Sequence, residues 1–174
     1  MMTRFACIGD THFYGGSRNT DRLRSMDAII AEVLALDGLG ATLYPGDVFH
    51  ARATTTNLND VDERLQLLAS HAPVILAKGN HDEIGSLDGF ARLAAKFPIY
   101  VVTSAQCLRF QCATGEWATC FIFPYPDKSV LVADGVAPAD IPQAAAVALD
   151  GIFLGAGAEL TAARKRGDLT LMIG

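Results

Sequence analysis

The segment PVILAKGNHD, residues 73–82, joins an apolar run to a polar loop. Its first six residues have the apolar character and the opening proline that are typical of a buried strand bounded by a turn. Asn80, His81 and Asp82 are therefore predicted to lie where a central strand ends. Ligands of open α/β sheets commonly bind at such strand ends, so these residues are the first candidates for a site.

Two earlier segments are organised in the same way. The run RFACIG at residues 4–9 leads into Asp10-Thr11-His12, and the run ATLYP at residues 41–45 leads into GDVFH at residues 46–50. Each of the three loops thus combines aspartate with histidine. A single aspartate would be ordinary in a loop or a helix cap. Its recurrence with histidine after three predicted strands favours one shared functional site.

Helical periodicity separates these strands. Apolar residues at helical spacing predict a helix over residues 20–37, and Asn57 or Asn59 is expected to cap a second helix. Ser86 is expected to cap a third. The order β-α-β-α-β-α predicts a parallel sheet with right-handed crossover helices.

After residue 99 the pattern changes to strands. Strand character covers residues 99–102, 106–113 and 117–123, with a hairpin turn at 113–116, and a mostly helical stretch at 144–166 precedes a last strand at 169–173. The predicted fold class is therefore α/β in one domain over residues 1–174. Its parallel core strands and crossover helices are followed by antiparallel strands.

The composition indicates a folded globule. The 174 residues are 51% hydrophobic and 19% charged, which fits one domain with a sizeable core and excludes a disordered chain. The formal net charge of −5 does not indicate a nucleic-acid binder, although bound divalent cations would change the local field. The four cysteines form no CxxC pair and are predicted to be reduced, buried thiols.

The N-terminus leads directly into a strand, so no signal peptide is expected and the predicted location is cytoplasmic. The longest apolar stretch, residues 144–158, is interrupted by Asp150. It is expected to be too short and too polar to span a bilayer, and no membrane contact is predicted.

Together the three motifs resemble those of the calcineurin-like metallophosphoesterases, which read DxH, GDxx(D/H) and GNH(D/E), each after a strand. Each motif is weak alone, but three in this order are specific. Within that superfamily the chain is most similar to the Mre11/SbcD DNA-repair nucleases, through its Asp-Thr-His opening, the histidine that closes the second motif, and GNHD. The resemblance is best over residues 1–100. It implies a layered metallophosphoesterase-type fold.

The resemblance also implies a dinuclear metal site. It assigns Asp10 and His12 to the first ion and Asp47 to a position that bridges both ions. Asn80 is assigned to the second ion, although asparagine after glycine also suits a turn. Two ions about 3.5–4 Å apart can activate a water and neutralise a phosphate. Mixed carboxylate, imidazole and amide ligands suit Mn²⁺, Fe or Zn, of which Mn²⁺ is expected.

Three catalytic residues follow from the same resemblance. His81 would face the substrate as an acid or a transition-state stabiliser, and His50 would orient it. Asp82 would pair with His81 or cap the next loop. Four arginines are expected in or near loops that adjoin the site, namely Arg18, Arg22, Arg24 and Arg52. They are candidates for contacts with a DNA backbone, Arg18 and Arg52 first, and the alternative is a solvated charged face.

Aromatic residues alternate along one predicted strand and its end, at Trp117, Phe121, Phe123 and Tyr125. Core packing is the favoured role for them. Stacking on nucleic-acid bases is the alternative.

The implied function is a metal-dependent phosphodiesterase, with a DNA exonuclease or endonuclease of Mre11/SbcD type as the first candidate. Such nucleases often form homodimers and bind an SMC-like ATPase. A phosphatase or phosphodiesterase of small phosphoesters is the alternative, because surface loops decide the substrate. The family pattern continues with a histidine after the last strand and a Gly-His-x-His motif, and neither occurs before Gly174. The fold is therefore expected to be incomplete at the C-terminus, and a non-catalytic fragment is the third candidate.

Overall fold

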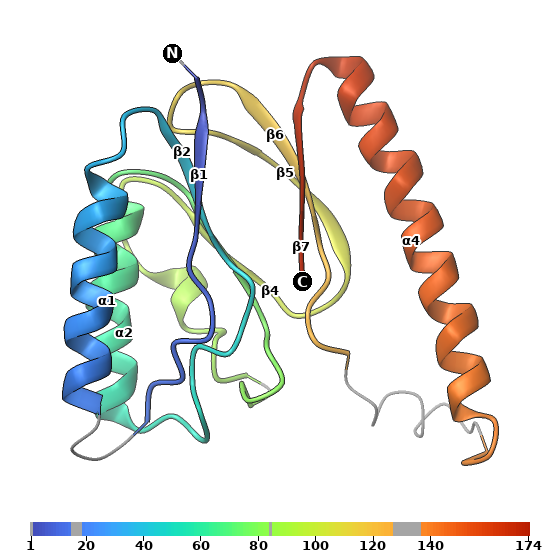
Figure 1. The fold of residues 1–174 in the computed structure, drawn as a ribbon, viewed down its shortest axis with the longest axis horizontal. Helices are drawn as coiled ribbons and strands as arrows, with labels where there is room; N and C mark the ends of the chain where they lie inside the picture. The colour runs from blue at the N-terminus through green and yellow to red at the C-terminus, as the bar shows by residue number, and fades with distance from the viewer. Residues whose placement is uncertain (1, 15–18, 84, 127–136) are drawn as a thin grey trace.

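The computed structural model describes residues 2–14, 19–83, 85–126 and 137–174. They form four layers, in which a pair of helices, two sheets and a long helix follow one another across the molecule (Figure 1). The pair consists of α1 (Asn19–Leu34) and α2 (Thr55–Ala69), and the long helix is α4 (Ile141–Arg166). The strands are β1 (Arg4–Cys7), β2 (Leu39–Tyr44), β3 (Val74–Ala77), β4 (Ile99–Val102), β5 (Gln106–Gln111), β6 (Trp117–Ile122) and β7 (Leu169–Ile173).

The first sheet is parallel throughout, in the order β1-β2-β3-β4. The prediction of a parallel core sheet is confirmed, and β4 extends it. Every residue of β2 and β3 is buried, which explains why these strands are continuous apolar runs without alternation. Since the strands are parallel, their carboxyl ends lie at one edge, where the three motif loops begin.

The second sheet contains β5, β6 and β7. The first two form the expected antiparallel hairpin, with Gln111 opposite Trp117 beside the turn. Strand β7 pairs parallel with β6, so the prediction of antiparallel strands holds for the hairpin alone. One apolar cluster fills the space between the two sheets. A second cluster fills the space between the first sheet and helices α1 and α2.

Two helix predictions need correction. Helix α2 is capped by Thr54, whose hydroxyl accepts from the amide of Asn57 at 3.3 Å, and not by an asparagine. The third predicted helix reduces to a single 3-10 turn, Phe90–Arg92. Gly85 before it has a left-handed φ of 82°, and Leu93 after it is extended, so a longer helix cannot form there.

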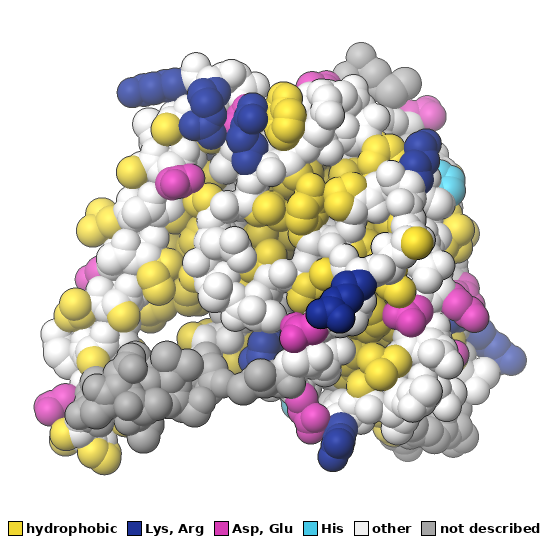
Figure 2. Space-filling model, turned by 180° about the vertical axis from the view of Figure 1, so that it is seen from behind, with side chains coloured by type: hydrophobic (Ala, Val, Ile, Leu, Met, Phe, Trp, Pro, Cys, Tyr) yellow, Lys and Arg dark blue, Asp and Glu magenta, His cyan; other side chains and the backbone are white. Residues whose placement is uncertain are grey.

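Helix α4 lies on the second sheet, but most of its surface is exposed. It is continuous over 26 residues, with Ala156 and Ala163 as its buried residues, and Leu154 is 76% exposed. Among the described helices, α4 is long and apolar enough to cross a membrane, judged by length and composition alone. The expectation that this stretch is too short and too polar was therefore wrong. Figure 2 shows hydrophobic side chains at the surface on the side of the molecule where α4 lies.

The end of α4 is fastened to the second sheet by Asp168, whose side chain is 2% exposed. Its carboxylate accepts hydrogen bonds from Arg109 at 2.9 and 3.1 Å, from the Thr119 hydroxyl at 2.9 Å and from Arg166 at 3.2 Å. The bonds from Arg109 are the main reason why the pKa of Asp168 lies below the usual value of an aspartate.

All four cysteines are free thiols. The prediction of buried thiols is confirmed for Cys112 and Cys120, while Cys107 is half-buried and Cys7 is exposed. Burial raises the pKa of Cys112 to about 11 and that of Cys120 to about 12, so both remain protonated at neutral pH.

Candidate metal centre

The loops that follow β1, β2 and β3 meet at the carboxyl edge of the first sheet. Backbone hydrogen bonds join the first two loops, since the amide of His12 donates to the carbonyl of Asp47 and the amide of His50 to that of Phe13, both at 3.0 Å. The third loop is attached through the amide of His81, which donates to Oδ1 of Asp47 at 3.0 Å. Asp47 is therefore the residue at which all three loops meet.

Three residues of this edge have a strained backbone. Asp10, His12 and Asp47 have φ angles of 55°, 46° and 53°, and no other non-glycine residue in the described part of the chain has a positive φ. Such conformations cost about 1–3 kcal/mol each and cluster at functional sites. The family resemblance assigns two of these residues, Asp10 and His12, to the first metal ion and the third, Asp47, to the bridge between two ions.

Two glycines allow the loops to approach each other this closely. A Cβ atom on Gly79 would lie 2.1 Å from both the backbone nitrogen and Oδ1 of Asp47. A Cβ atom on Gly46 would lie 2.7 Å from Cα of Gly79, and Gly46 also has a φ of 137°. Glycine is thus required before Asp47 and before Asn80, because any side chain would push the second and third loops apart.

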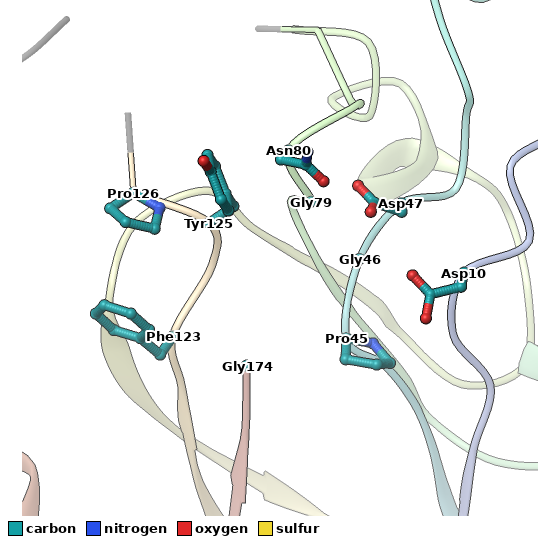
Figure 3. A pocket seen from close by; sticks show the side chains of 10 residues that line it. All are labelled: Asp10, Pro45, Gly46, Asp47, Gly79, Asn80, Phe123, Tyr125, Pro126 and Gly174. Carbon is teal, nitrogen blue, oxygen red and sulfur yellow. The ribbon is translucent and has the colours of Figure 1, made fainter. Parts of the chain in front are cut away.

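The carboxylates and an imidazole converge in front of these glycines. Nε2 of His12 lies 3.8 Å from Oδ1 of Asp10 and 4.0 Å from Oδ2 of Asp47. One ligand atom from each residue lies within 4.8 Å of the other two. Asp10 and Asp47 line an open cleft of about 350 Å³, which has Phe123 and Tyr125 on its opposite wall (Figure 3).

Asn80 points its side-chain amide at the carboxylate of Asp47 (Figure 3). With the amide nitrogen on that side, Asn80 donates to both carboxylate oxygens, at 2.8 and 3.1 Å. With the amide oxygen on that side, it faces two carboxylate oxygens, and such a cluster of acceptors suits a bound cation. In both orientations the side-chain amide of Asn80 lies next to the carboxylate of Asp47, as two ligands of one ion must.

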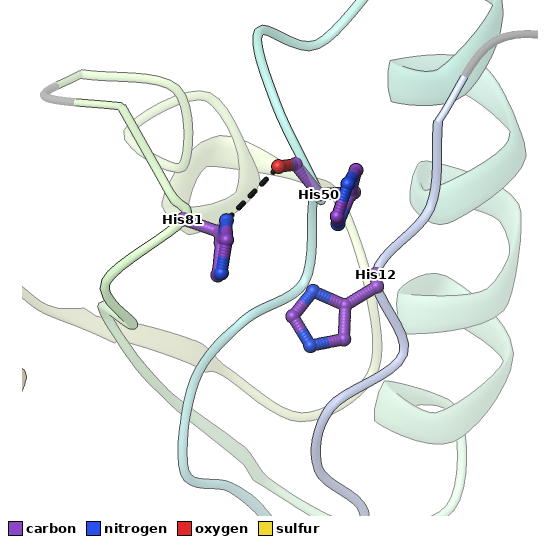
Figure 4. A group of neighbouring side chains, drawn as sticks. All are labelled: His12, His50 and His81. Carbon is purple, nitrogen blue, oxygen red and sulfur yellow. Dashed lines mark hydrogen bonds between the residues drawn. The ribbon is translucent and has the colours of Figure 1, made fainter.

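His81 and His50 stand next to this group. Nδ1 of His81 lies 3.1 Å from the carbonyl oxygen of His50 (Figure 4), and the two rings stack with their centroids 5.3 Å apart. The side chain of His50 was expected to orient His81, but Nδ1 of His81 donates its hydrogen bond to the backbone carbonyl of His50. Because a carbonyl only accepts, Nδ1 of His81 must carry a proton, and Nε2 is the nitrogen left free.

Residues 3–144 match the family model of the calcineurin-like phosphoesterases. The chain belongs to the calcineurin-like phosphoesterase family. A solved structure similar to this chain is that of nuclease MPE from Pseudomonas putida, with 22% sequence identity, a TM-score of 0.40, and coverage of 59% of this chain and 48% of the nuclease. The chain thus spans about half the length of that nuclease. No match was found among curated proteins.

Calcineurin-like phosphoesterases use divalent metal ions, and the residues of this member fit one. Asp10, His12 and Asp47 offer two carboxylates and an imidazole within reach of a single ion. Asn80 adds an amide oxygen beside Asp47. This mixed set of oxygen and nitrogen ligands suits a hard or borderline divalent cation. Their assignment as ligands stays a prediction.

Asp82 is buried in this phosphoesterase, whereas its neighbour His81 is exposed at the site. The buried side chain of Asp82 accepts hydrogen bonds from the backbone amides of Gly79 and Phe49, both at 2.9 Å, and of Val48 at 3.4 Å. It makes no hydrogen bond to His81, so the expected pairing is corrected. Asp82 instead clamps the second loop to the third, which is the capping role that was its alternative.

Of the two arginines predicted to bind substrate, the described one, Arg52, does not line the cleft. Arg52 is exposed in the loop before α2, and Arg18 lies outside the described residues. The arginine that contacts the site is Arg22, which donates to the carbonyl oxygen of His12 and stacks on the ring of Tyr14 at 4.4 Å. Arg22 lies in the first turns of α1 and was among the arginines expected to adjoin the site, although its contact with a backbone carbonyl was not predicted.

The aromatic residues of β6 and its end divide into two groups. Phe121 is buried in the core, as expected, whereas Tyr125 is 47% exposed and lines the cleft with Phe123. Tyr125 is held there by its amide, which donates to the carbonyl of Lys78 at 2.9 Å. Trp117 at the other end of β6 is exposed and packs against Arg109, with the guanidinium 4.1 Å from the ring centroid. Core packing was therefore the wrong expectation for Tyr125 and for Trp117.

Proposed function

We propose that this phosphoesterase is a metal-dependent phosphodiesterase whose substrate is DNA, as in nucleases of Mre11/SbcD type. The observation that carries the proposal is the convergence of Asp10, His12 and Asp47, all with left-handed backbones, on one cleft edge with Asn80. Two divalent cations, with Mn²⁺ as the expected metal, would be held there. When bound, they supply an activated water and neutralise the phosphate oxygens.

His81 is proposed to act on the leaving group. Its backbone amide is tied to Asp47 and its Nδ1 proton to the carbonyl of His50, so the ring cannot turn without losing a hydrogen bond. When the ring is protonated, Nδ1 keeps that bond and the proton on Nε2 is available for the leaving oxygen. Proton donation from a positioned side chain contributes roughly 10²–10⁴-fold to a rate.

The opposite wall of the cleft supports a nucleic-acid substrate over a small phosphoester. Phe123 and Tyr125 face the acidic residues across a space of about 350 Å³. Base stacking on an aromatic side chain contributes about 1–3 kcal/mol per base, whatever the base. A small phosphoester that carries no base would gain nothing from an exposed tyrosine here, whereas successive bases of DNA would.

The roles of the metal centre and of His81 are tested by cleavage of duplex and single-stranded DNA with Mn²⁺. We expect His81→Ala to lose at least about 10²-fold in rate while it keeps its Mn²⁺ affinity. His71→Ala is the matched control, since His71 is exposed at the end of α2 and bonds only within that helix end. Unchanged cleavage by His81→Ala would remove His81 from the mechanism.

The substrate class is tested by comparing DNA with glycerophosphocholine, a phosphodiester that has no aromatic ring. We expect Tyr125→Ala to lower DNA turnover about ten-fold, as the loss of one stacked base predicts, and to leave small-ester turnover unchanged. Trp117→Ala is the control, because it removes an exposed aromatic from the far end of β6. Rapid turnover of the small ester without DNA cleavage would favour the small-phosphoester alternative. No turnover of either substrate would favour a non-catalytic fragment.

Homodimer formation, an SMC-like ATPase partner and a cytoplasmic location stay predictions from the resemblance. The substrate contacts assigned to Arg18 and Arg52 stay predictions as well.

A further inference from the structure

Three of the chain's four histidines come together beside the carboxylate site. They are His12, His50 and His81, one from each motif loop, and their ring centroids lie 5.0 to 5.5 Å apart. One ring nitrogen from each histidine lies within 4.8 Å of the other two. Figure 4 shows the ring of His12 below the nearly parallel rings of the other two. The family resemblance assigns His12 to a metal ion and has His50 orient His81, and it does not make the three histidines ligands of one ion.

The tautomer of His81 suits a metal ligand. Its Nδ1 is fixed as a donor by the carbonyl of His50 at 3.1 Å, which leaves the lone pair on Nε2. Histidines that bind metals commonly donate their second ring nitrogen to a carbonyl or a carboxylate in this way.

His12 belongs to both groups. Its Nε2 faces the carboxylates of Asp10 and Asp47, at 3.8 and 4.0 Å. Its Nδ1 is buried and has no hydrogen-bond partner in the part of the chain that the structure describes. Buried polar atoms without a partner are uncommon, and each one calls for an explanation. A metal ion that His12 binds together with the two stacked histidines would explain the unpaired nitrogen.

We propose that His12, His50 and His81 form a second metal site, which binds one ion of the kind that prefers imidazole ligands, such as Zn²⁺. When this site is occupied, His12 is no longer available as a ligand for an ion at Asp10 and Asp47. Three imidazoles suit Zn²⁺, Cu²⁺ or Ni²⁺, whereas the carboxylate-rich group suits Mn²⁺ or Mg²⁺. A tetrahedral ion with bonds of about 2.0–2.1 Å needs ligand nitrogens closer together than 4.8 Å. The exposed side chain of His50 can close that gap by a change of rotamer, while Nδ1 of His81 keeps its hydrogen bond.

The consequence for activity rests on the proposed function. An ion in the three-histidine site would occupy Nε2 of His81, so the proton donor for the leaving group would be lost. It would also draw His12 away from the carboxylates. Zn²⁺ is therefore expected to inhibit the Mn²⁺-dependent reaction without preventing DNA from binding.

The site is tested by calorimetric titration of the metal-free chain with Zn²⁺ and, separately, with Mn²⁺. His50→Gln is expected to weaken Zn²⁺ binding at least about ten-fold, in line with the loss of an imidazole ligand, and to leave Mn²⁺ binding unchanged. Asp10→Asn is expected to do the reverse. His71→Gln, which alters the fourth histidine, is the control and should change neither affinity. Circular dichroism checks that each variant is folded.

Co²⁺ provides a second readout, since its visible absorption reports tetrahedral nitrogen ligation. We expect the tetrahedral bands in the native chain and in Asp10→Asn, and their loss in His50→Gln. Zn²⁺ binding that falls as much in Asp10→Asn as Mn²⁺ binding does would place zinc among the carboxylates and overturn the proposal. Zn²⁺ binding that is unchanged in His50→Gln would overturn it as well. If the variant pattern holds but Mn²⁺ supports no hydrolysis, the proposed function fails while the three-histidine site stands.

Discussion

Removal of the Asp82 carboxylate should separate the loops that carry the site. The side chain is 3% exposed and accepts from two amides at 2.9 Å and a third at 3.4 Å. In Asp82→Ala the two well-placed amides remain buried without an acceptor, and each costs about 1–3 kcal/mol. The long third bond adds little. We therefore expect the free energy of unfolding to fall by about 3–5 kcal/mol, among the largest effects of a single substitution.

Urea denaturation followed by circular dichroism at neutral pH measures this loss. Asp82→Asn keeps one acceptor oxygen and the shape of the side chain, so we expect it to lose about 1–2 kcal/mol. Asp88→Ala is the control, because Asp88 is exposed six residues further along, and a change below about 0.5 kcal/mol is usual there. A loss below about 1 kcal/mol in Asp82→Ala would refute the clamp, since the amides would then have found other acceptors.

Three further substitutions or modifications test the structure around the site. Gly79→Ala places a Cβ 2.1 Å from the backbone nitrogen of Asp47, so we expect a lower unfolding midpoint and an Mn²⁺ affinity at least about ten-fold weaker by calorimetry; an unchanged affinity would contradict the close approach. Asp168 has a pKa below that of a free aspartate, so its contribution to stability is full above about pH 4 and is lost as the pH falls toward the lowered pKa. Asp168→Asn should therefore make the urea midpoint less sensitive to pH below about pH 4, and an equally steep decline would count against the ion pairs. In the native protein a thiol-specific reagent should label the exposed Cys7 first and Cys120, whose pKa is raised to about 12, only after unfolding; equal labelling rates would contradict the burial.

The placement of the three motif loops could be predicted because the signals for it are local. Apolar runs such as residues 73–78 define strands, and parallel pairing brings their carboxyl ends to one edge. The resemblance of the three motifs to those of the calcineurin-like phosphoesterases then implied a metal centre at Asp10, His12, Asp47 and Asn80, and that assignment stays a prediction. The position of the site therefore followed from the order of the strands.

The roles of adjacent polar residues could not be predicted in the same way. His81 and Asp82 are neighbours in the sequence, yet one is exposed at the site and the other is buried beneath it. The turn after β3 decides which side chain points inward, and that turn is set by contacts with the second loop. The exposed position of Tyr125 likewise depends on a backbone bond to Lys78 across the cleft, which no periodicity records.

Helix ends were the other source of error. Thr54 and Asn57 are both good capping residues, and their competition is decided by the path of the chain out of the second loop. The apolar residues around Phe90 are spaced as in a helix. Over so few residues, however, a 3-10 turn with one buried side chain gives a similar pattern, so the sequence could not distinguish the two.

The most direct measurement of the metal centre is an anomalous difference map from a crystal of this protein grown with Mn²⁺. We expect a peak within bonding distance of carboxylate oxygens of Asp10 and Asp47 and of Nε2 of His12, in the cleft that faces Tyr125. A map at saturating Mn²⁺ with no peak there, or with its strongest peak away from Asp47, would contradict the assignment of these loops as a phosphoesterase metal centre.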